Sequence, residues 1–475
     1  MSCQFLRSFA GVCRAPGTPP HQQEEVALLR INPGICAVLL LVPCLARQAR
    51  AQNPLPDSPS AQDIAAQMAR PQPPAARAYT WTQLLDRFQS ANPTLIADQG
   101  SVDESRAQEI TAHLRPNPQF TLLTDGTQLR PYNGVWRPLA GTEIQSMLSY
   151  LHEREHKREL RLQNAQDQTA ITISEHLDLE RNLVYNLRLA FVQTLQSKAT
   201  LRLAQDNLDY YDRLLAISKD RFQAGDIAEI DYDRLDLQRV QYESDLETAK
   251  VNLRSAKITL QQLLNDRTPV EQFDVTGQYD FSDQTPPLDQ VRQTALDNRP
   301  DLKAQMQAVD MAQAGHKLAI ANGSADPTVS SWWTHNPSFN NPYDEDALGL
   351  SVSVPLRIFD RNQGEKLRTQ LDIARNQRLA DAATAKVFSD VDTAYAQVRS
   401  NVALLVPYRK KYLDQATHVR DTITFSYQHG GASLLDLLNA QADYRTVELS
   451  YMNLIASYLT SAAQLNLAVG REVLP

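Results

Sequence analysis

The chain has 475 residues, of which only 16 are glycine, and it carries a net charge of −8. Nucleic-acid-binding proteins usually have a basic stripe, so this acidic balance argues against that class. The mean hydropathy of −0.41 excludes a membrane protein built from many apolar helices. Few glycines, with abundant Gln, Ala, Leu and Arg, favour long helices that face water.

An export signal is predicted over residues 1–51. The most apolar stretch, 35–46, is too short to span a bilayer but suits the core of a signal peptide, and Ala49-Arg50-Ala51 fits a cleavage site. A short buried helix is the alternative. Leu41-Val42-Pro43-Cys44 partly resembles a lipoprotein signal, although proline stands where a small residue is expected, so acylation of Cys44 remains open.

Cleavage after residue 51 would remove all four cysteines and leave 424 residues with a net charge of −11. The mature chain would then have no disulfide, no cysteine nucleophile and no zinc–cysteine site. No later segment reaches 18 consecutive apolar residues, so no membrane-spanning helix is predicted. Passage through a membrane would therefore require a closed β-barrel.

A Pro-, Gln- and Ala-rich flexible linker is expected over residues 52–79, and two similar halves follow it. Asn92-Pro93-x-Leu95 recurs as Arg299-Pro300-x-Leu302, and Phe222-Gln223-x-Gly225 recurs as Tyr427-Gln428-x-Gly430, at offsets of 207 and 205 residues. Ordered matches at a nearly constant offset indicate internal duplication. We therefore expect repeats over residues 80–270 and 288–475, joined by an inter-repeat linker over 271–287.

Each repeat is predicted to begin with one helix, over residues 81–114 or 288–322, and to continue with two short strands. In the second repeat, Leu348, Leu350, Val352 and Val354 alternate with small or polar residues, the period of a strand with two different faces. Residues 329–333 are its expected partner, and Trp332 and Trp333 suit a membrane interface. Residues 119–124 and 143–151 are the weaker first-repeat counterparts.

Long helices are predicted after the strands. Residues 365 to about 427 contain no glycine and only Pro407, which predicts one very long helix. In the first repeat, Leu187, Phe191, Leu208 and Tyr211 belong to a seam with coiled-coil spacing. Glycines end these helices, and return helices are expected over 231–265 and 434–469.

Four short strands cannot close a barrel, and open strand edges are not stable in lipid. If the strands lie in a membrane, several chains must share one barrel. The long helix pairs would then line a polar tunnel. The alternative is a structural coiled-coil envelope protein whose strands form a small cap.

Over residues 80–472 the chain resembles the TolC-like outer membrane efflux protein family. The resemblance rests on the Asn-Pro-x-Leu opening of the first repeat, on Val354-Pro355-Leu356 after the strand, and on the helix-turn segment from Tyr427 to Gln441. Arg221 to Asp226 is similar to that segment.

The resemblance implies a mainly α fold with a small β part. Three identical chains would form one α-helical periplasmic tunnel and one shared 12-stranded barrel in the outer membrane. The protein would have no catalytic residues and no cofactor. Its partners would be a periplasmic adaptor, an inner-membrane transporter and outer membrane lipid, and not nucleic acid.

The resemblance also implies the site residues. The tunnel would be constricted at its periplasmic end by acidic side chains, for which Asp231 and Asp436 are the matching positions. Asn439 replaces a second acidic residue. Carboxylates from three chains would create a negative field that favours cations, although Asp436 could instead serve only to stabilise a helix N-terminus. The helix-turn tips for adaptor docking are Gly225, Asp226, Gly430, Gly431 and Ser433.

Residues 355–365 look like the ducts of heavy-metal resistance pumps, the CzcC-like branch. Residues 157–161 fit the same branch, although His156 stands where glycine is usual. Metal cations are therefore one expected cargo, and organic solutes, drugs or secreted peptides are the others.

A different function is suggested by His152-Glu153-Arg154-Glu155-His156, which matches the H-E-x-x-H signature of zinc-dependent hydrolases. Glu175 could supply a third ligand. That chemistry requires both histidines on one helical face in a dry site. The charged residues that follow and the strand that precedes favour an ordinary strand-to-helix junction instead.

Overall fold

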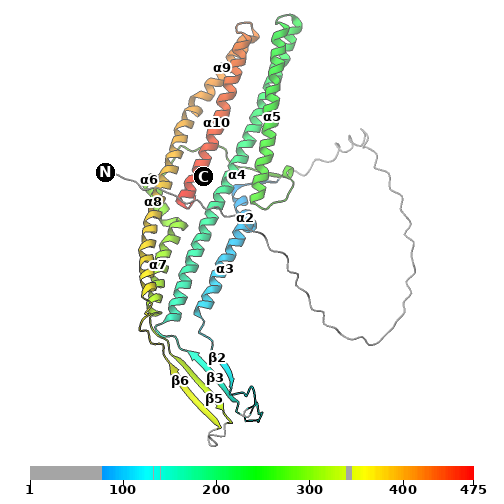
Figure 1. Ribbon diagram of the computed structural model, residues 1–475. Coiled ribbons are helices and arrows are strands. Elements are labelled where there is room, and N and C mark those ends of the chain that lie inside the picture. The colour runs from blue at the N-terminus through cyan, green and yellow to red at the C-terminus, as the bar shows by residue number, and fades with distance from the viewer. Residues whose placement is uncertain (1–76, 132, 140, 338–344, 475) are drawn as a thin grey trace, which may run out of the picture. The chain divides into compact units, whose positions relative to one another are not determined.

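The computed structural model describes residues 77–131, 133–139, 141–337 and 345–474. The predicted signal peptide, Cys44 and most of the 52–79 linker lie outside these residues. Gln72–Pro475 forms one compact unit. In this unit the four-stranded sheet lies at one end of the long helices, and the turns between those helices lie at the other end (Figure 1).

The same order of elements occurs twice along the chain. The first half contains β1 (Arg77–Tyr79), α2 (Trp81–Ala91), α3 (Pro93–His113), β2 (Gln119–Asp125), β3 (Glu143–Leu151), α4 (Lys157–Ala224) and α5 (Glu229–Leu263). The second half contains a 3₁₀ turn η1 (Val270–Gln272), β4 (Phe273–Val275), α6 (Leu288–Asn298), α7 (Pro300–Ala321), β5 (Thr328–His335), β6 (Asp346–Ser353), α8 (Gln363–Pro407), a π-helical turn η2 (Tyr408–Tyr412), α9 (Leu413–Gln428) and α10 (Leu434–Val469).

The two segments expected to be linkers each contribute a strand. β1 comes from the end of the 52–79 segment and β4 from the 271–287 segment, and they pair in parallel. Phe273 and Val275 of β4 are buried against α2, α4 and α5. These ends of the expected linkers are therefore part of the folded unit.

Each opening helix is divided in two, contrary to the single helices predicted over 81–114 and 288–322. Asn92 and Arg299 both adopt extended backbone angles, and a proline follows each of them. A proline disfavours helical geometry in the residue before it, yet it is well suited to the first position of a new helix. Pro93 and Pro300 therefore end one helix and begin the next.

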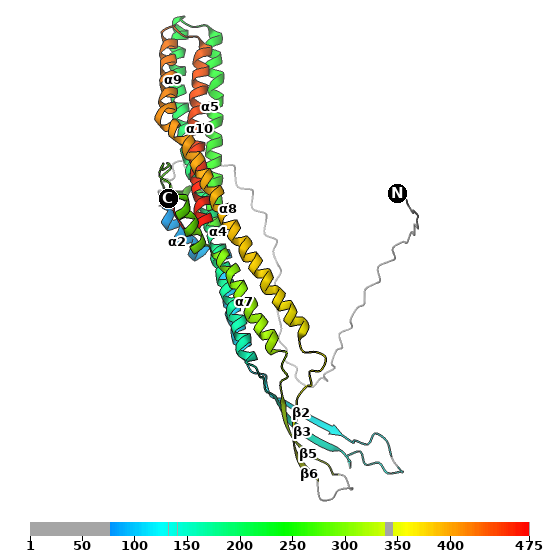
Figure 2. The same cartoon turned by 90° about the vertical axis from the view of Figure 1, so that its left-hand side faces the viewer.

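The long helix predicted over residues 365 to about 427 is also interrupted. α8 ends at Pro407, a π-helical turn follows, and α9 begins at Leu413. Proline has no amide hydrogen for the helical ladder, and its ring crowds the carbonyl four residues earlier. A π turn accommodates that defect, and the helix changes direction between α8 and α9 (Figure 2).

The predicted strands are observed in one antiparallel sheet with the order β2-β3-β5-β6. Its two halves join through β3 and β5, where Met147 is opposite Trp332. Val354 lies one residue beyond β6.

Among the described residues, no helix is both long enough and apolar enough to cross a membrane.

Candidate functional site

The four-stranded sheet has one apolar face. Successive residues of a strand point to opposite faces, so the strand register assigns each side chain to a face. One face gathers exposed apolar side chains from all four strands: Phe120, Leu122, Ile144, Leu148, Val329, Trp333, Leu348, Leu350 and Val352. Such an area is far more apolar than a water-exposed sheet face would be.

The opposite face is more polar and carries small side chains, although Leu123, Met147 and Leu151 also lie on it. It includes Thr121, Ser149, Ser330 and Ser351, together with Trp332. The Trp332 ring lies over Gly349, where an added Cβ would come within 2.2 Å of the ring. Trp332 and Trp333, predicted together as interface anchors, therefore lie on opposite faces, and only Trp333 belongs to the apolar face.

Both outer strands of this sheet have an open edge within the chain. β2 pairs only with β3 and β6 only with β5 among the described strands. An unpaired edge leaves a row of backbone donors and acceptors without partners. Another strand is needed on each side of the sheet in any setting without water.

The first helix-turn tip joins α4 to α5. Gly225 adopts the left-handed conformation, with φ of 82°, and the amide of Asp226 donates to the Arg221 carbonyl at 2.8 Å. Asp231 lies in the first turn of α5, and its carboxylate is 4.0 Å from the Arg234 guanidinium.

The second tip joins α9 to α10 and contains a reciprocal capping box. Gly430 has φ of 77°, and the amide of Gly431 donates to the Ser426 carbonyl at 2.7 Å. The Asp436 amide donates to the Ser433 hydroxyl at 3.2 Å, and the Ser433 amide donates to the Asp436 carboxylate at 3.1 Å. The hydrogen bonds from the Ser433 hydroxyl and amide lower the pKa of Asp436. Asp436 therefore stabilises the start of α10 and stays ionised at neutral pH.

The three residues predicted to constrict a pore occupy comparable places on two separate hairpins. Asp231 and Asp436 both lie in the first turn of a return helix, and Asn439 follows Asp436 on α10. Asp436 and Asn439 are exposed, and Asp231 is half-buried. No hydrogen bond or ion pair joins Asp231 to Asp436 among the described residues. Within one chain they form two charged points at the same end of the helices.

A link between the two tips was not predicted from sequence. The Arg221 guanidinium, near the end of α4, donates to the Tyr427 carbonyl, near the end of α9, at 3.0 Å. It also lies 5.3 Å from the centre of the Tyr427 ring. A contact between residues 206 positions apart leaves no local sequence pattern. Arg221 therefore fastens the α4–α5 hairpin to the α9–α10 hairpin.

The H-E-x-x-H segment does not form the helical site that a zinc hydrolase needs. β3 ends at Leu151 and α4 begins only at Lys157, so the two histidines precede the helix. His156 has a left-handed backbone with φ of 55°, and its side chain is exposed. Glu153 forms a bidentate ion pair with Arg161. The two histidines therefore do not share a helical face, which the zinc-hydrolase alternative requires of this segment. No group of three or more metal-binding side chains occurs among the described residues.

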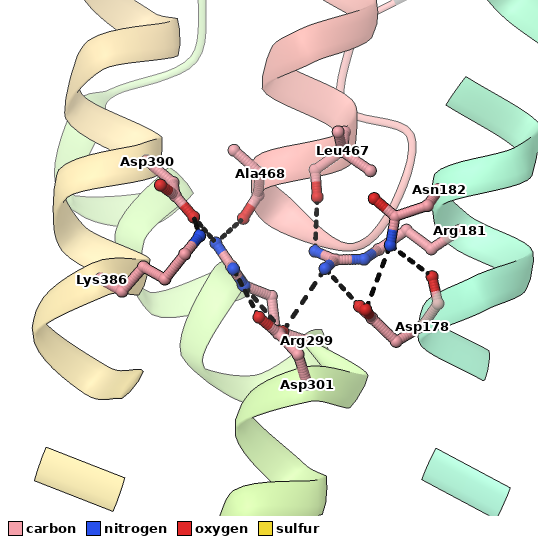
Figure 3. Close-up of polar contacts among 9 residues, drawn as sticks. All are labelled: Asp178, Arg181, Asn182, Arg299, Asp301, Lys386, Asp390, Leu467 and Ala468. Atoms are coloured by element: carbon pink, nitrogen blue, oxygen red, sulfur yellow. Dashed lines mark hydrogen bonds and ion pairs between the residues drawn. The ribbon is translucent and has the colours of Figure 1, made fainter. Parts of the chain in front are cut away.

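The C-terminus of α10 is held by two arginines that the sequence did not identify as functional (Figure 3). Arg299 is buried and donates to the Ala468 carbonyl at 3.3 Å. Arg181, from α4, donates to the Leu467 carbonyl at 2.7 Å. The last carbonyls of a helix have no partner within the helix and carry partial negative charge, so both cations are well placed.

Carboxylates surround these arginines. Arg299 pairs with Asp301 at 2.6 Å and with Asp390 at 2.9 Å, while Asp301 also lies 3.5 Å from Arg181. Burial opposes ionisation of both aspartates, but the hydrogen bonds from neighbouring cations prevail and lower the pKa of each. The network joins α4, α7, α8 and α10 at one level of the bundle.

The first half has a smaller set of contacts at the corresponding position, the end of its return helix. Asn92, which corresponds to Arg299, is buried and donates to the Leu263 carbonyl at the end of α5, at 2.9 Å. Its side-chain oxygen accepts from the amides of Thr94 and Leu95 and caps α3. Both halves thus fasten the end of the return helix to the residue before the Pro-x-Leu segment that begins α3 or α7.

Comparisons with known proteins agree with this architecture. Residues 291–471 match the family model of outer membrane efflux proteins. The chain is 22% identical over 400 residues to the cobalt-zinc-cadmium resistance protein CzcC of Cupriavidus metallidurans, an alignment that covers 84% of this chain and 91% of that protein.

A second relative is the pyoverdine export outer membrane protein OpmQ of Pseudomonas aeruginosa, 22% identical over 309 residues, or 62% of each chain. Among solved structures, CusC, a protein described as forming a transmembrane channel, superposes with a TM-score of 0.71 at 17% identity. That superposition covers 85% of this chain and 96% of CusC.

Proposed function

We propose that the chain, whose residues 291–471 match the family model of outer membrane efflux proteins, is the passive exit duct of a tripartite efflux pump. Three copies form a tunnel that runs from the periplasm through the outer membrane. The observation that carries this proposal is the sheet, which combines one apolar face, one polar face and two open edges at the end of long helical hairpins.

The sheet has the chemistry of one third of a closed barrel. The apolar face, with Leu348, Leu350 and Val352, is suited to lipid, and the polar face is suited to a water-filled lumen. Joining β2 of one copy to β6 of the next satisfies both open edges, and three copies of four strands close a 12-stranded barrel. The proposed duplication supplies two of the four strands from each half.

Cysteine cross-linking tests this closure. Thr121 on β2 and Ser351 on β6 lie on the polar face at opposite edges, and no native cysteine occurs after Cys44. The double variant Thr121→Cys/Ser351→Cys should give a covalent trimer on a denaturing gel. Thr121→Cys/Ser353→Cys tests a strand pairing that is shifted along β6. The single variants are the controls and should give none. A detergent-purified protein that light scattering finds monomeric would contradict the proposal.

The helix-turn tips form the periplasmic constriction and the adaptor-docking end in this proposal. In a trimer, Asp231, Asp436 and Asn439 of each copy surround the tunnel axis, and the ionised Asp436 carboxylates favour cations there. The Arg221–Tyr427 bond keeps the two hairpins of each chain together and the tunnel narrow.

We further propose that the cargo is a metal cation. CzcC, a cobalt-zinc-cadmium resistance protein, is similar over most of both chains, and an acidic constriction suits cations. OpmQ, a pyoverdine export protein, supports an organic cargo as the second candidate. Deleting the gene should lower tolerance to cobalt, zinc or cadmium salts. Unchanged tolerance, with loss of siderophore export, would favour the second candidate.

The duct performs no catalysis and needs no cofactor in this proposal. Energy comes from an inner-membrane transporter, and a periplasmic adaptor connects that transporter to the tips at Gly225, Asp226, Gly430, Gly431 and Ser433.

A further inference from the structure

Hydrogen bonds order the described part of the loop between β2 and β3, residues 126–131, 133–139 and 141–142. The Gln128 amide donates to the Pro138 carbonyl at 3.0 Å. The Gln128 side chain accepts from the Arg137 amide at 2.8 Å and donates to the Val135 carbonyl at 3.2 Å. One glutamine therefore bridges the two sides of the loop with three hydrogen bonds.

Turn residues define the tip and the base of this loop. Asn133 and Gly134 both have positive φ, at 52° and 78°, as an Asn-Gly hairpin turn requires. At the base, Gly126 lies so close to Gly141 that an added Cβ would come within 2.5 Å of the Gly141 carbonyl oxygen. The loop thus extends the β2–β3 hairpin with a defined shape.

This fixed shape holds apolar side chains outward. Leu129 is 89% exposed and Leu139 is 73% exposed, and Val135 and Trp136 are each about half exposed. Exposed large apolar residues that gather on one ordered loop indicate contact with another apolar surface. Tryptophan beside leucine is typical of the boundary between lipid headgroups and acyl chains.

The same loop is cationic. Arg130 and Arg137 are exposed, and neither guanidinium has an ion-pair partner among the described residues. The sequence from 126 to 142 contains no acidic residue. At its base, the Asp125 carboxylate accepts from the Gly126 amide, and Glu143 accepts from the Asn336 side chain. The two arginines are therefore available to an external anion.

The other loop of this end of the sheet differs in charge. Residues 336–345 contain Asp344 and Glu345 and no Lys or Arg. A uniform need for solubility would not give one cationic, apolar loop and one acidic, polar loop. The contrast points to a specific anionic and amphiphilic partner for the β2–β3 loop.

We propose that the β2–β3 loop binds the headgroup region of an anionic lipid leaflet. Arg130 and Arg137 pair with lipid phosphates, while Leu129, Trp136 and Leu139 enter the boundary with the acyl chains. Guanidinium groups bind phosphate through two parallel hydrogen bonds, and each cation near an anionic surface adds to the attraction. The inference rests on the proposed function, which puts this end of the sheet at the outer surface of the membrane.

A single environment-sensitive fluorophore on the loop tests the proposal. The label is attached to Leu129→Cys of the mature protein, which otherwise lacks cysteine, in nanodiscs of zwitterionic phospholipid or of an equal zwitterionic and anionic mixture. We expect a blue-shifted emission that is larger in the anionic nanodiscs and that high salt reduces. Arg130→Gln/Arg137→Gln should remove the difference. The matched pair Arg378→Gln/Arg399→Gln should retain it, because these arginines of α8 are exposed and have no ion pair with any other described residue.

Three results would overturn the proposal: equal emission in both nanodiscs, a difference that survives Arg130→Gln/Arg137→Gln, or a blue-shifted label in detergent that cross-links to another copy. The last would mean that a neighbouring chain covers the loop. Planar-bilayer conductance of the same purified proteins separates the loop proposal from the proposed duct function. A conducting protein without the lipid effect refutes only the loop proposal, whereas a non-conducting protein refutes the duct.

Discussion

The two halves of the molecule contain the same elements in the same order, but they hold their helices differently. In the first half, α4 runs without a break over 68 residues, and a single uncharged residue, Asn92, fastens the end of α5. In the second half, Pro407 and a π turn divide the corresponding helix, and a charged network around Arg299 fastens α10. A continuous helix is stiff by itself, whereas an interrupted one depends on its side-chain bonds.

The tips differ in the same way. The Ser433–Asp436 capping box precedes α10, whereas Ala228, the residue before α5, provides no side-chain cap. The second half therefore combines a bend with stronger fastening at both ends of its return helix.

The largest expected effect comes from removing the charged joint. Arg299→Ala removes the buried cation that Asp301 and Asp390 share, although Arg181 and Lys386 remain near them, and should lower the free energy of unfolding by about 3 kcal/mol. Asn92→Ala loses neutral hydrogen bonds and should cost about 1–2 kcal/mol. Urea unfolding in detergent, followed by tryptophan fluorescence, measures both. Equal losses of unfolding free energy would mean that the contacts of Arg299 and of Asn92 stabilise the two halves equally.

The same joint predicts a pH dependence. Against the opposing effect of burial, hydrogen bonds from Arg299 lower the pKa of Asp301, and hydrogen bonds from Lys386 and Arg299 lower the pKa of Asp390. The stability that these carboxylates contribute is therefore complete above the ordinary aspartate pKa, near 4, and is lost as the pH falls through the lowered values. The free energy of unfolding of the wild-type protein should therefore decrease in acid, and that of Arg299→Ala should decrease less steeply. Identical slopes would contradict the role assigned to Arg299.

The link between the tips gives the next effect. Arg221→Ala removes a charge-assisted hydrogen bond of about 1.5–3 kcal/mol, so the open state should become at least about ten times more populated. Channel recordings should find a higher open probability. Arg202→Ala, which removes an exposed cation from the same helix, is the control and should leave it unchanged. If Arg221→Ala has the same open probability as the wild-type protein, the Arg221–Tyr427 hydrogen bond does not keep the tunnel narrow.

Charge at the proposed constriction should have a smaller effect. Asp436→Asn removes the carboxylate charge and keeps an oxygen that can accept from Ser433, so block by multivalent cations should require severalfold more cation. Asp231→Asn should act in the same direction, and Asp414→Asn on α9 should have no effect. If only Asp436→Ala changes the block, then the carboxylate matters as a helix cap and not as part of a ring.

The smallest effect concerns the caps. Ser433→Ala should lose about 1 kcal/mol at the start of α10, and Ala228→Ser should add a cap of similar value to α5. Hydrogen exchange of the first-turn amides of the two helices measures the change locally. No change in either helix would mean that the capping box does not account for the difference between the tips.

Local patterns in the sequence predicted the strands and the ends of the long helices. Alternation located β6, and Gly225 and Gly430 lie where the helices end, because a left-handed backbone favours glycine. The sequence contains Pro93, Pro300 and Pro407, but the helix breaks at these prolines were not predicted. Whether a proline ends a helix depends on the backbone of the preceding turn. Trp332 and Trp333 were grouped by composition, although adjacent strand residues must face opposite ways.

Contacts between distant residues could not be predicted. Arg221 and Tyr427 belong to different hairpins, and Arg299 meets Ala468 across 169 positions. Their partners are determined by how the helices pack, and no spacing rule connects them. The acidic positions Asp231 and Asp436 came from the family resemblance, and the joint action proposed for them involves residues of three chains.

Planar-bilayer recording of the purified mature protein tests the duct most directly. The account predicts discrete conductance steps that favour cations over anions, from a protein that needs detergent to remain in solution. A protein that stays soluble without detergent and gives no conductance would contradict it.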